Sequence, residues 1–133
     1  MTDYLADTHT FLWALFSKDR LTVQAREILE DENVIVYVSA ISFWEISLKH
    51  SIGKLEIAPF TAQELLEVGE QSGFVLTGLS PLEAATFYRL PRLAHRDPFD
   101  RMLIWQAIRQ KLTLISRDAA FADYRRHGLK VVW

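Results

Sequence analysis

The sequence contains no cysteine, and this absence excludes several kinds of site. Without thiols there is no disulfide framework, no thiolate zinc site and no cysteine nucleophile. Only five glycines and four prolines interrupt the 133 residues, half of which are hydrophobic. This composition and length predict one globular domain over residues 1–133 with a core of its own.

Long apolar runs are absent too. No stretch approaches the roughly 18 apolar residues that a membrane span needs. The first residues lead directly into Asp3 and Tyr4, without an apolar signal segment. We therefore expect a soluble protein of the cytoplasm that has no membrane partner.

The net charge of −2 hides a division between the two parts of the chain. Residues 1–88 hold 5 Lys/Arg against 13 Asp/Glu, a balance of −8, and residues 89–133 hold 10 against 4, a balance of +6. A basic segment on a near-neutral protein attracts polyanions locally. Charges interleaved on solvated helices give the same numbers, so the division is compatible with nucleic-acid binding without establishing it.

Short apolar segments alternate along the chain with segments of helical periodicity. The strand-like segments are residues 4–6, 34–38, 74–76, 112–115 and 129–133. Short, almost wholly apolar strands between helices predict an α/β fold with a parallel sheet of about four to five strands flanked by helices. In such sheets ligands bind beyond the carboxyl ends of the strands.

A long helix begins within the segment His95–Arg101. Asp97 suits the N-cap, and Pro98 fits the first helical position, where its missing N–H costs nothing. Asp100 falls in the first turn, on the face that Leu103 continues. In the simplest interpretation, Asp97 caps the helix, Asp100 completes the cap, and neither takes part in chemistry.

Three further acids lie at positions of interest. Asp7 ends the first strand and Asp118 follows the fourth, and either side chain can simply cap the next helix. Glu45 lies on the apolar stripe of the helix expected over residues 39–52. Its alternative role is an exposed ion pair with Lys49, one turn later.

Taken together, the acids point to a cation. Asp7, Glu45, Asp100 and Asp118 all lie near a strand's carboxyl end or a helix start, positions that converge on one edge of an α/β sheet. Two unit charges about 4 Å apart repel by roughly 4 kcal/mol at an effective dielectric constant near 20. Oxygen ligands, with no cysteine and no histidine pair at i, i+4, favour Mg²⁺ or Mn²⁺. Such an ion activates water for attack on a phosphodiester.

Several motifs in these regions resemble those of a known family. They are Asp7-Thr8-His9 with Phe11-Leu12-Trp13, Val38-Ser39-Ala40 with Trp44-Glu45-Ile46, Gly53-Lys54-Leu55, the segment His95–Leu103, and Leu114-Ile115-Ser116-Arg117-Asp118. The set spans nearly the whole chain and is similar to PIN-domain proteins, and within them to the VapC-type toxins of bacterial type II toxin–antitoxin pairs.

The resemblance implies a Rossmann-like PIN domain that acts as a Mg²⁺-dependent endoribonuclease, with Mn²⁺ as a substitute ion. The family's acidic quartet falls on Asp7, Glu45, Asp100 and Asp118. Asp7 and Asp100 are the expected direct metal ligands, whereas Glu45 and Asp118 orient water or a second ion.

Further residues and partners follow from the same resemblance. Thr8 and Ser116 stand where the family often has a hydroxyl beside the metal waters, and Asp97 is an additional acid. The family also implies an RNA substrate, a VapB-like antitoxin whose tail blocks the active site, and a toxin homodimer.

The basic residues have a role compatible with this function. Arg96, Arg101 and Arg117 are candidates for holding RNA phosphates beside the metal, and other arginines of the same basic segment are Arg89, Arg92, Arg125 and Arg126. Each of them taken alone is better interpreted as a solvated surface charge. The histidines, His95 among them, are interpreted as capping or packing residues. The aromatic residues Phe11, Trp13, Phe43 and Trp44 are interpreted as mostly core, with any exposed member available to pack against a partner.

Two other classes of function were weighed. A phospho-accepting domain of flavodoxin-like fold needs an acidic pair after the first strand and an acceptor Asp after the third. Here one acid follows the first strand, and the third leads into Thr77 and Gly78, which excludes this class. A catalytically inactive PIN-fold module that binds only its antitoxin stays as the alternative.

Overall fold

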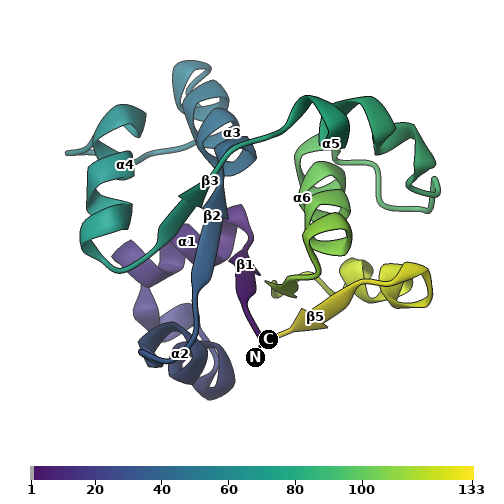
Figure 1. Cartoon of the computed structure of the whole chain (residues 1–133). Coiled ribbons are helices and arrows are strands. Elements are labelled where there is room, and N and C mark those ends of the chain that lie inside the picture. Colours follow the sequence, from purple (N-terminus) through teal and green to yellow (C-terminus); the bar gives the residue numbers. More distant parts are fainter. Residues whose placement is uncertain (1) are drawn as a thin grey trace.

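A computed structural model describes residues 2–133 of the chain, which form an α/β fold (Figure 1). Its five strands are β1 (Tyr4–Ala6), β2 (Val36–Ser39), β3 (Val75–Thr77), β4 (Thr113–Ile115) and β5 (Lys130–Val132). They form one sheet in the order β3-β2-β1-β4-β5, and every pair is parallel. The predicted fold class is confirmed, and the carboxyl ends of the strands lie along one edge.

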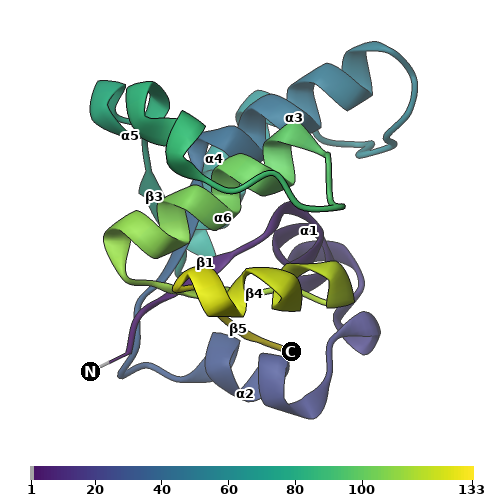
Figure 2. The ribbon, with the colours of Figure 1, turned by 90° about the vertical axis from the view of Figure 1, so that its right-hand side faces the viewer.

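Helices cover both faces of this sheet (Figures 1 and 2). The α-helices are α1 (Thr8–Phe16), α2 (Val23–Glu30), α3 (Ala40–Ser51), α4 (Ala62–Gln71), α5 (Pro81–Thr86) and α6 (Pro98–Gln110). Three 3₁₀ segments are η1 (Lys18–Arg20), η2 (Phe87–Arg89) and η3 (Ala119–His127). In Figure 1, α1, α2 and α4 lie on one side of the sheet, and α5 and α6 lie on the other. None of the helices in residues 2–133 combines the length and apolar character needed to cross a membrane.

The alternation of side chains along the strands divides the core into two. Leu5 and Leu114 belong to the cluster under α6, whereas their neighbours Ala6 and Ile115 belong to the cluster under α1, α2 and α4. All four side chains are fully buried. Successive residues of a strand point to opposite faces, so two short apolar strands supply both halves of the core.

Local capping places the helix starts where the sequence predicts them. Asp97 accepts a hydrogen bond from the Asp100 N–H at 3.0 Å, and Pro98 occupies the first turn of α6. The helix that Ser80 caps is short, because α5 ends at Thr86 and the chain continues as η2. The Thr86 hydroxyl donates to the carbonyl oxygen of Leu82, an arrangement that competes with the regular helical ladder.

Trp44 is the exposed member of the aromatic set that the sequence predicts to be mostly core. Its side chain is 61% exposed, and Leu48 and Ile52 on the same stripe of α3 are exposed as well. Trp44 packs edge-on against Phe99, with ring centroids 5.0 Å apart. The outer part of α3 extends past the end of the sheet (Figure 1), so apolar spacing along this helix overstates its burial.

Candidate active site

Asp7 lies at the carboxyl end of β1, next to the end of β4. Its Oδ1 accepts a hydrogen bond from the Thr10 N–H at 2.8 Å, so Asp7 is the N-cap of α1. The Ser116 hydroxyl, which follows β4, also bonds the Asp7 carboxyl and accepts the Asp118 N–H at 3.1 Å. Burial raises the pKa of Asp7, although the hydrogen bonds from Ser116 and Thr10 lower it in part. Because burial disfavours the charged form of Asp7, a cation beside it would stabilise the carboxylate.

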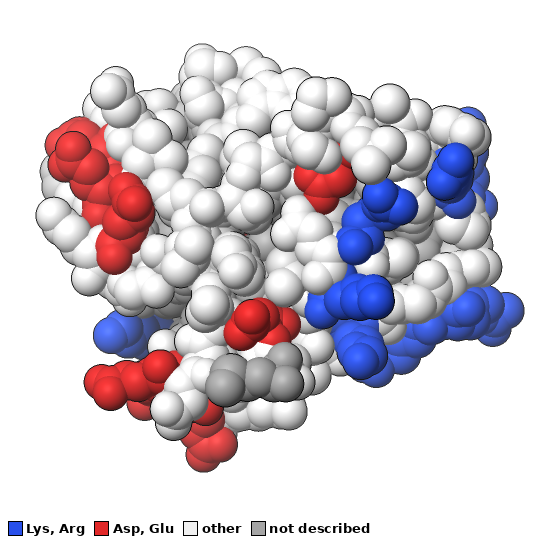
Figure 3. Space-filling view, viewed as in Figure 1, with Lys and Arg blue, Asp and Glu red and all other residues white. Residues whose placement is uncertain are grey.

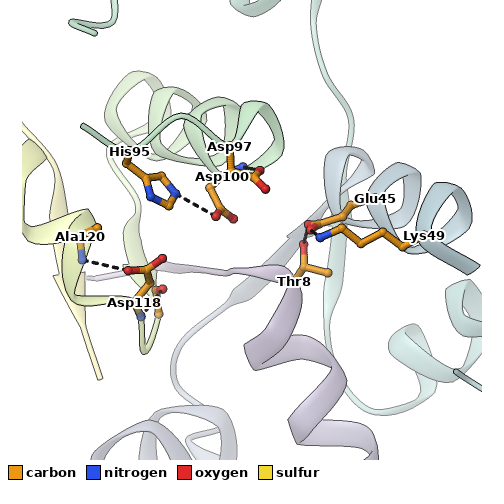
Figure 4. Close-up of polar contacts among 9 residues, drawn as sticks. Thr8, Glu45, Lys49, His95, Asp97, Asp100, Asp118 and Ala120 are labelled. Atoms are coloured by element: carbon orange, nitrogen blue, oxygen red, sulfur yellow. Dashed lines mark hydrogen bonds and ion pairs between the residues drawn. The ribbon is translucent and has the colours of Figure 1, made fainter. Parts of the chain in front are cut away.

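Glu45 extends from α3 toward the start of α1. The Thr8 hydroxyl donates to Glu45 Oε1 at 2.6 Å, and Ser42 Oγ lies 3.0 Å from the same hydroxyl. Lys49 Nζ donates to the other carboxylate oxygen (Figure 4). The ion pair that the sequence suggests between Glu45 and Lys49 is therefore present. Its acid is buried, however, because Glu45 is only 3% exposed. Burial follows from the packing of α3 on α1.

Asp100 and Asp118 lie close together although they come from different elements. His95, Asp100 and Asp118 each present a ligand atom, and the three atoms lie within 4.8 Å of one another. The imidazole Nε2 of His95 is 2.9 Å from Asp100 Oδ2, and Asp118 Oδ1 accepts the Ala120 N–H at 2.9 Å (Figure 4). We call these three residues the acid–histidine cluster. It is the candidate metal site of residues 2–133.

Asp100 connects this cluster to the other acids. Burial is the main cause that raises its pKa to about 6, the charges of Asp97 and Glu45 raise it further, and the hydrogen bond with His95 opposes them. The pKa of Lys49 is raised by its pairing with Glu45 and by the charges of Asp97 and Asp100, although desolvation acts against this. Asp97, Asp100, Glu45 and Lys49 therefore share one electrostatic environment.

The structure thus places the predicted residues in three adjoining groups. Asp7 lies with Ser116, Glu45 with Thr8 and Lys49, and Asp100 with Asp118 and His95. Capping does not use up the acids, because each capping bond of Asp7, Asp97 and Asp118 occupies Oδ1 and leaves the second oxygen.

Sequence reasoning did not find two residues of this region. His95 was interpreted as a packing or capping residue, yet it bonds Asp100 directly. Lys49 was considered only as a surface partner of Glu45. In both cases the available signal was spacing, because His95 stands five residues before Asp100 in the same motif and Lys49 stands one helical turn after Glu45.

The donor chemistry of the acid–histidine cluster fits a divalent cation. Two carboxylates converge, and burial of Asp100 makes its charge unfavourable without a counter-charge. Carboxylate oxygens suit Mg²⁺ and Mn²⁺, and ligating carboxylates are themselves held by hydrogen bonds, as His95 holds Asp100.

Most of the basic side chains visible in Figure 3 lie on one side of the face that it draws. In Figure 3, the Lys and Arg side chains gather on the side where Figure 1 shows α5 and α6, and acidic residues gather toward the opposite side. Arg96 and Arg101 line one hollow with His95. The guanidinium of Arg117 instead lies over the Trp13 ring, 5.7 Å from its centroid. On the face that Figure 3 draws, the charge division in the sequence is therefore also a division in space, from which Arg117 departs.

Fold and site together describe an α/β protein with acids gathered at the carboxyl edge of a parallel sheet. The model of the PIN-domain family matches residues 4–127, and the chain belongs to this family. A search of curated protein sequences finds no match.

Several solved structures share the fold over nearly the full chain. The VapBC2 complex of Rickettsia felis, bound to a DNA fragment from its promoter, has a TM-score of 0.68 at 16% identity, with 98% of each chain covered. DNA-bound VapBC from Salmonella typhimurium has a TM-score of 0.67 at 17% identity, covering 99% of this chain and 98% of that one. FitAcB from Neisseria gonorrhoeae has a TM-score of 0.63 at 22% identity, covering 98% and 96%. At these identities the likeness concerns the fold.

Proposed function

We propose that the protein is a Mg²⁺-dependent endoribonuclease and the toxin component of a VapBC-type toxin–antitoxin pair. The observation that carries this proposal is the acid–histidine cluster at the carboxyl edge of the sheet of a PIN-family chain. Because a fold alone does not define a reaction, the proposal depends on these side chains.

In this proposal, Asp7 and Asp100 ligate the ion, with Asp118 beside them. A divalent ion held there would activate water for attack on a phosphodiester. The Ser116 hydroxyl orients Asp7, and His95 holds Asp100. Thr8 bonds one oxygen of the Glu45 carboxylate and Lys49 pairs with the other, so the two residues together fix its orientation.

The proposal is tested by metal-dependent stability and by cleavage in parallel. Mn²⁺ should raise the melting temperature of the parent and of Asp19→Asn, an exposed control, but not that of Asp7→Asn or Asp100→Asn. Asn keeps the cap at position 7, because it serves as well as Asp at an N-cap. Cleavage of total RNA should follow the same pattern.

Two results contradict the proposal. RNA cleavage that survives both substitutions excludes Asp7 and Asp100 as ligands. Absence of both Mn²⁺ stabilisation and cleavage in the parent favours the catalytically inactive PIN-fold module instead.

The partners belong to the same proposal. A VapB-like antitoxin is supported by the fold shared with chains of VapBC complexes, and a homodimer is supported by the exposed apolar stripe Trp44, Leu48 and Ile52 on α3. Expression with and without the neighbouring small open reading frame, scored by growth arrest and by new RNA 5′ ends, tests the antitoxin. Light scattering of the purified chain tests the dimer.

A further inference from the structure

His95 belongs to the acid–histidine cluster and also lines a separate hollow of about 270 Å³. The residues that line this hollow are Arg92, Leu93, His95, Arg96 and Arg101. We call it the arginine hollow. It lies between the loop that precedes α6 and the first turns of α6 itself, and three of its five lining residues carry a permanent positive charge.

The arginines of the hollow lack carboxylate partners. Within residues 2–133, the ion pairs closer than 4.0 Å are Lys49–Glu45 and His95–Asp100, and neither includes an arginine. Arg92 and Arg96 are exposed, so their charges are available at the rim.

Arg101 gives a second, independent observation, a buried hydrogen-bond donor without an acceptor. Its Nε is buried and has no hydrogen-bond partner, while Nη2 reaches the carbonyl oxygens of Leu90 and Pro91 only at 3.3 and 3.4 Å. The guanidinium carbon lies 4.9 Å from the centroid of the Phe87 ring, which fixes the plane of the group. A partly buried guanidinium with an unsatisfied donor is costly unless an anion accepts from it.

We propose that the arginine hollow binds a backbone phosphate of the RNA strand, next to the phosphate that the acid–histidine cluster acts on. This inference rests on the proposed nuclease function. The planar fork of arginine matches the oxygens of a phosphate, and phosphate contacts fix the register of a strand without reading its sequence. Because His95 lines both sites, a strand anchored in the hollow passes directly to the acids.

The test measures binding without cleavage. A short, fluorescein-labelled, single-stranded RNA of mixed sequence is titrated in EDTA at several salt concentrations, and anisotropy gives the dissociation constant. Arg92→Gln and Arg96→Gln should each weaken binding about fivefold to tenfold. Each should also reduce the slope of log K against log salt by about 0.7, the value for one phosphate contact on a single strand.

Two control variants separate the hollow from general charge. Lys130→Gln removes the same charge from the first residue of β5, at the amino ends of the parallel strands and so away from the acids at their carboxyl ends. This substitution should change the slope little. Arg96→Lys keeps the charge and should retain the slope. Thermal melting confirms that each variant is folded.

Several outcomes overturn the inference. Equal slopes for Arg92→Gln, Arg96→Gln and Lys130→Gln would show that the arginine hollow makes no phosphate contact. A glutamate peptide of the same charge that binds as tightly as the RNA, and is weakened by the same substitutions, assigns the hollow to an acidic peptide instead. Failure of the nuclease proposal gives a different result. In that case metal-dependent cleavage is absent, while the slopes of log K against log salt in EDTA still differ between the arginine variants and Lys130→Gln.

Discussion

The Thr8 hydroxyl donates a 2.6 Å hydrogen bond to Glu45, 37 residues further along the chain. This bond joins the first turn of α1 to the middle of α3, and both of its residues are buried. Because Asp7, the N-cap of α1, precedes Thr8 directly, one backbone turn sets the positions of two of the proposed site acids.

Replacing Thr8 with valine keeps the shape of the side chain and removes its donor. The buried Glu45 oxygen then loses its partner, so the free energy of unfolding should fall by about 1–3 kcal/mol. Urea denaturation measures this change, with Thr2→Val at an exposed position as the control. Equal stability of Thr8→Val and the parent contradicts a structural role for the bond.

Removing the charge of Lys49 leaves a buried carboxylate without its cation. Lys49→Gln should lower the free energy of unfolding by about 1–2 kcal/mol in EDTA, less than the roughly 3–5 kcal/mol of a fully buried pair, because the lysine side chain is 35% exposed. In a Glu45→Gln background the same substitution should cost little. A double-mutant cycle by urea denaturation measures this coupling, and additive effects exclude it.

The two acids at the start of α6 should behave differently. Asp97→Ala should cost about 1 kcal/mol because the cap is lost, whereas Asp97→Asn should keep both stability and activity.

Asp100→Asn should instead abolish activity while leaving the metal-free protein at least as stable at neutral pH. The folded-state pKa of Asp100, about 6, lies above its usual value, so the ionised group destabilises the metal-free fold above pH 6. Thermal melting in EDTA and RNA cleavage measure the two properties. If Asp97→Asn loses activity and Asp100→Asn keeps it, Asp97 and not Asp100 is the acid that the activity requires.

Glu83 predicts a pH dependence of stability away from the site. Burial tends to raise its pKa, but hydrogen bonds from the Ser80 N–H (2.9 Å), Gln110 (2.6 Å) and Gln106 (3.5 Å) lower the pKa below the usual value of 4.5. A depressed folded-state pKa stabilises the protein above the usual pKa, and this contribution is lost as pH falls through the lower, folded-state value.

The stability difference between the parent and Glu83→Gln should therefore be constant near neutral pH and shrink in acid, as pH falls below the usual value of 4.5. Urea denaturation across this range measures it. A difference that grows in acid has the wrong sign and contradicts the depressed pKa.

Much of the architecture is readable from local patterns. Apolar segments of three to five residues became the strands, and Asp7, Asp97 and Asp118 became N-caps, because a cap depends on a side chain and an N–H two or three residues away. The exposed stripe ending in Ile52 shows the limit of this reasoning, since helical spacing reports a face of α3 and not what covers it.

The sequence by itself determined the alternation of strands and helices, the parallel sheet and the acids at its carboxyl edge, because these depend on short-range periodicity and on capping. Only the tertiary structure decided that His95 bonds Asp100 beside Asp118, that Glu45 is buried under Thr8, and that the arginines near His95 share one hollow. Two of these relationships, Thr8 with Glu45 and Asp118 with Asp100, join residues far apart in the chain, and the arginines come together through the course of the loop that precedes α6. Side-chain packing between elements sets them, and no local spacing encodes that packing.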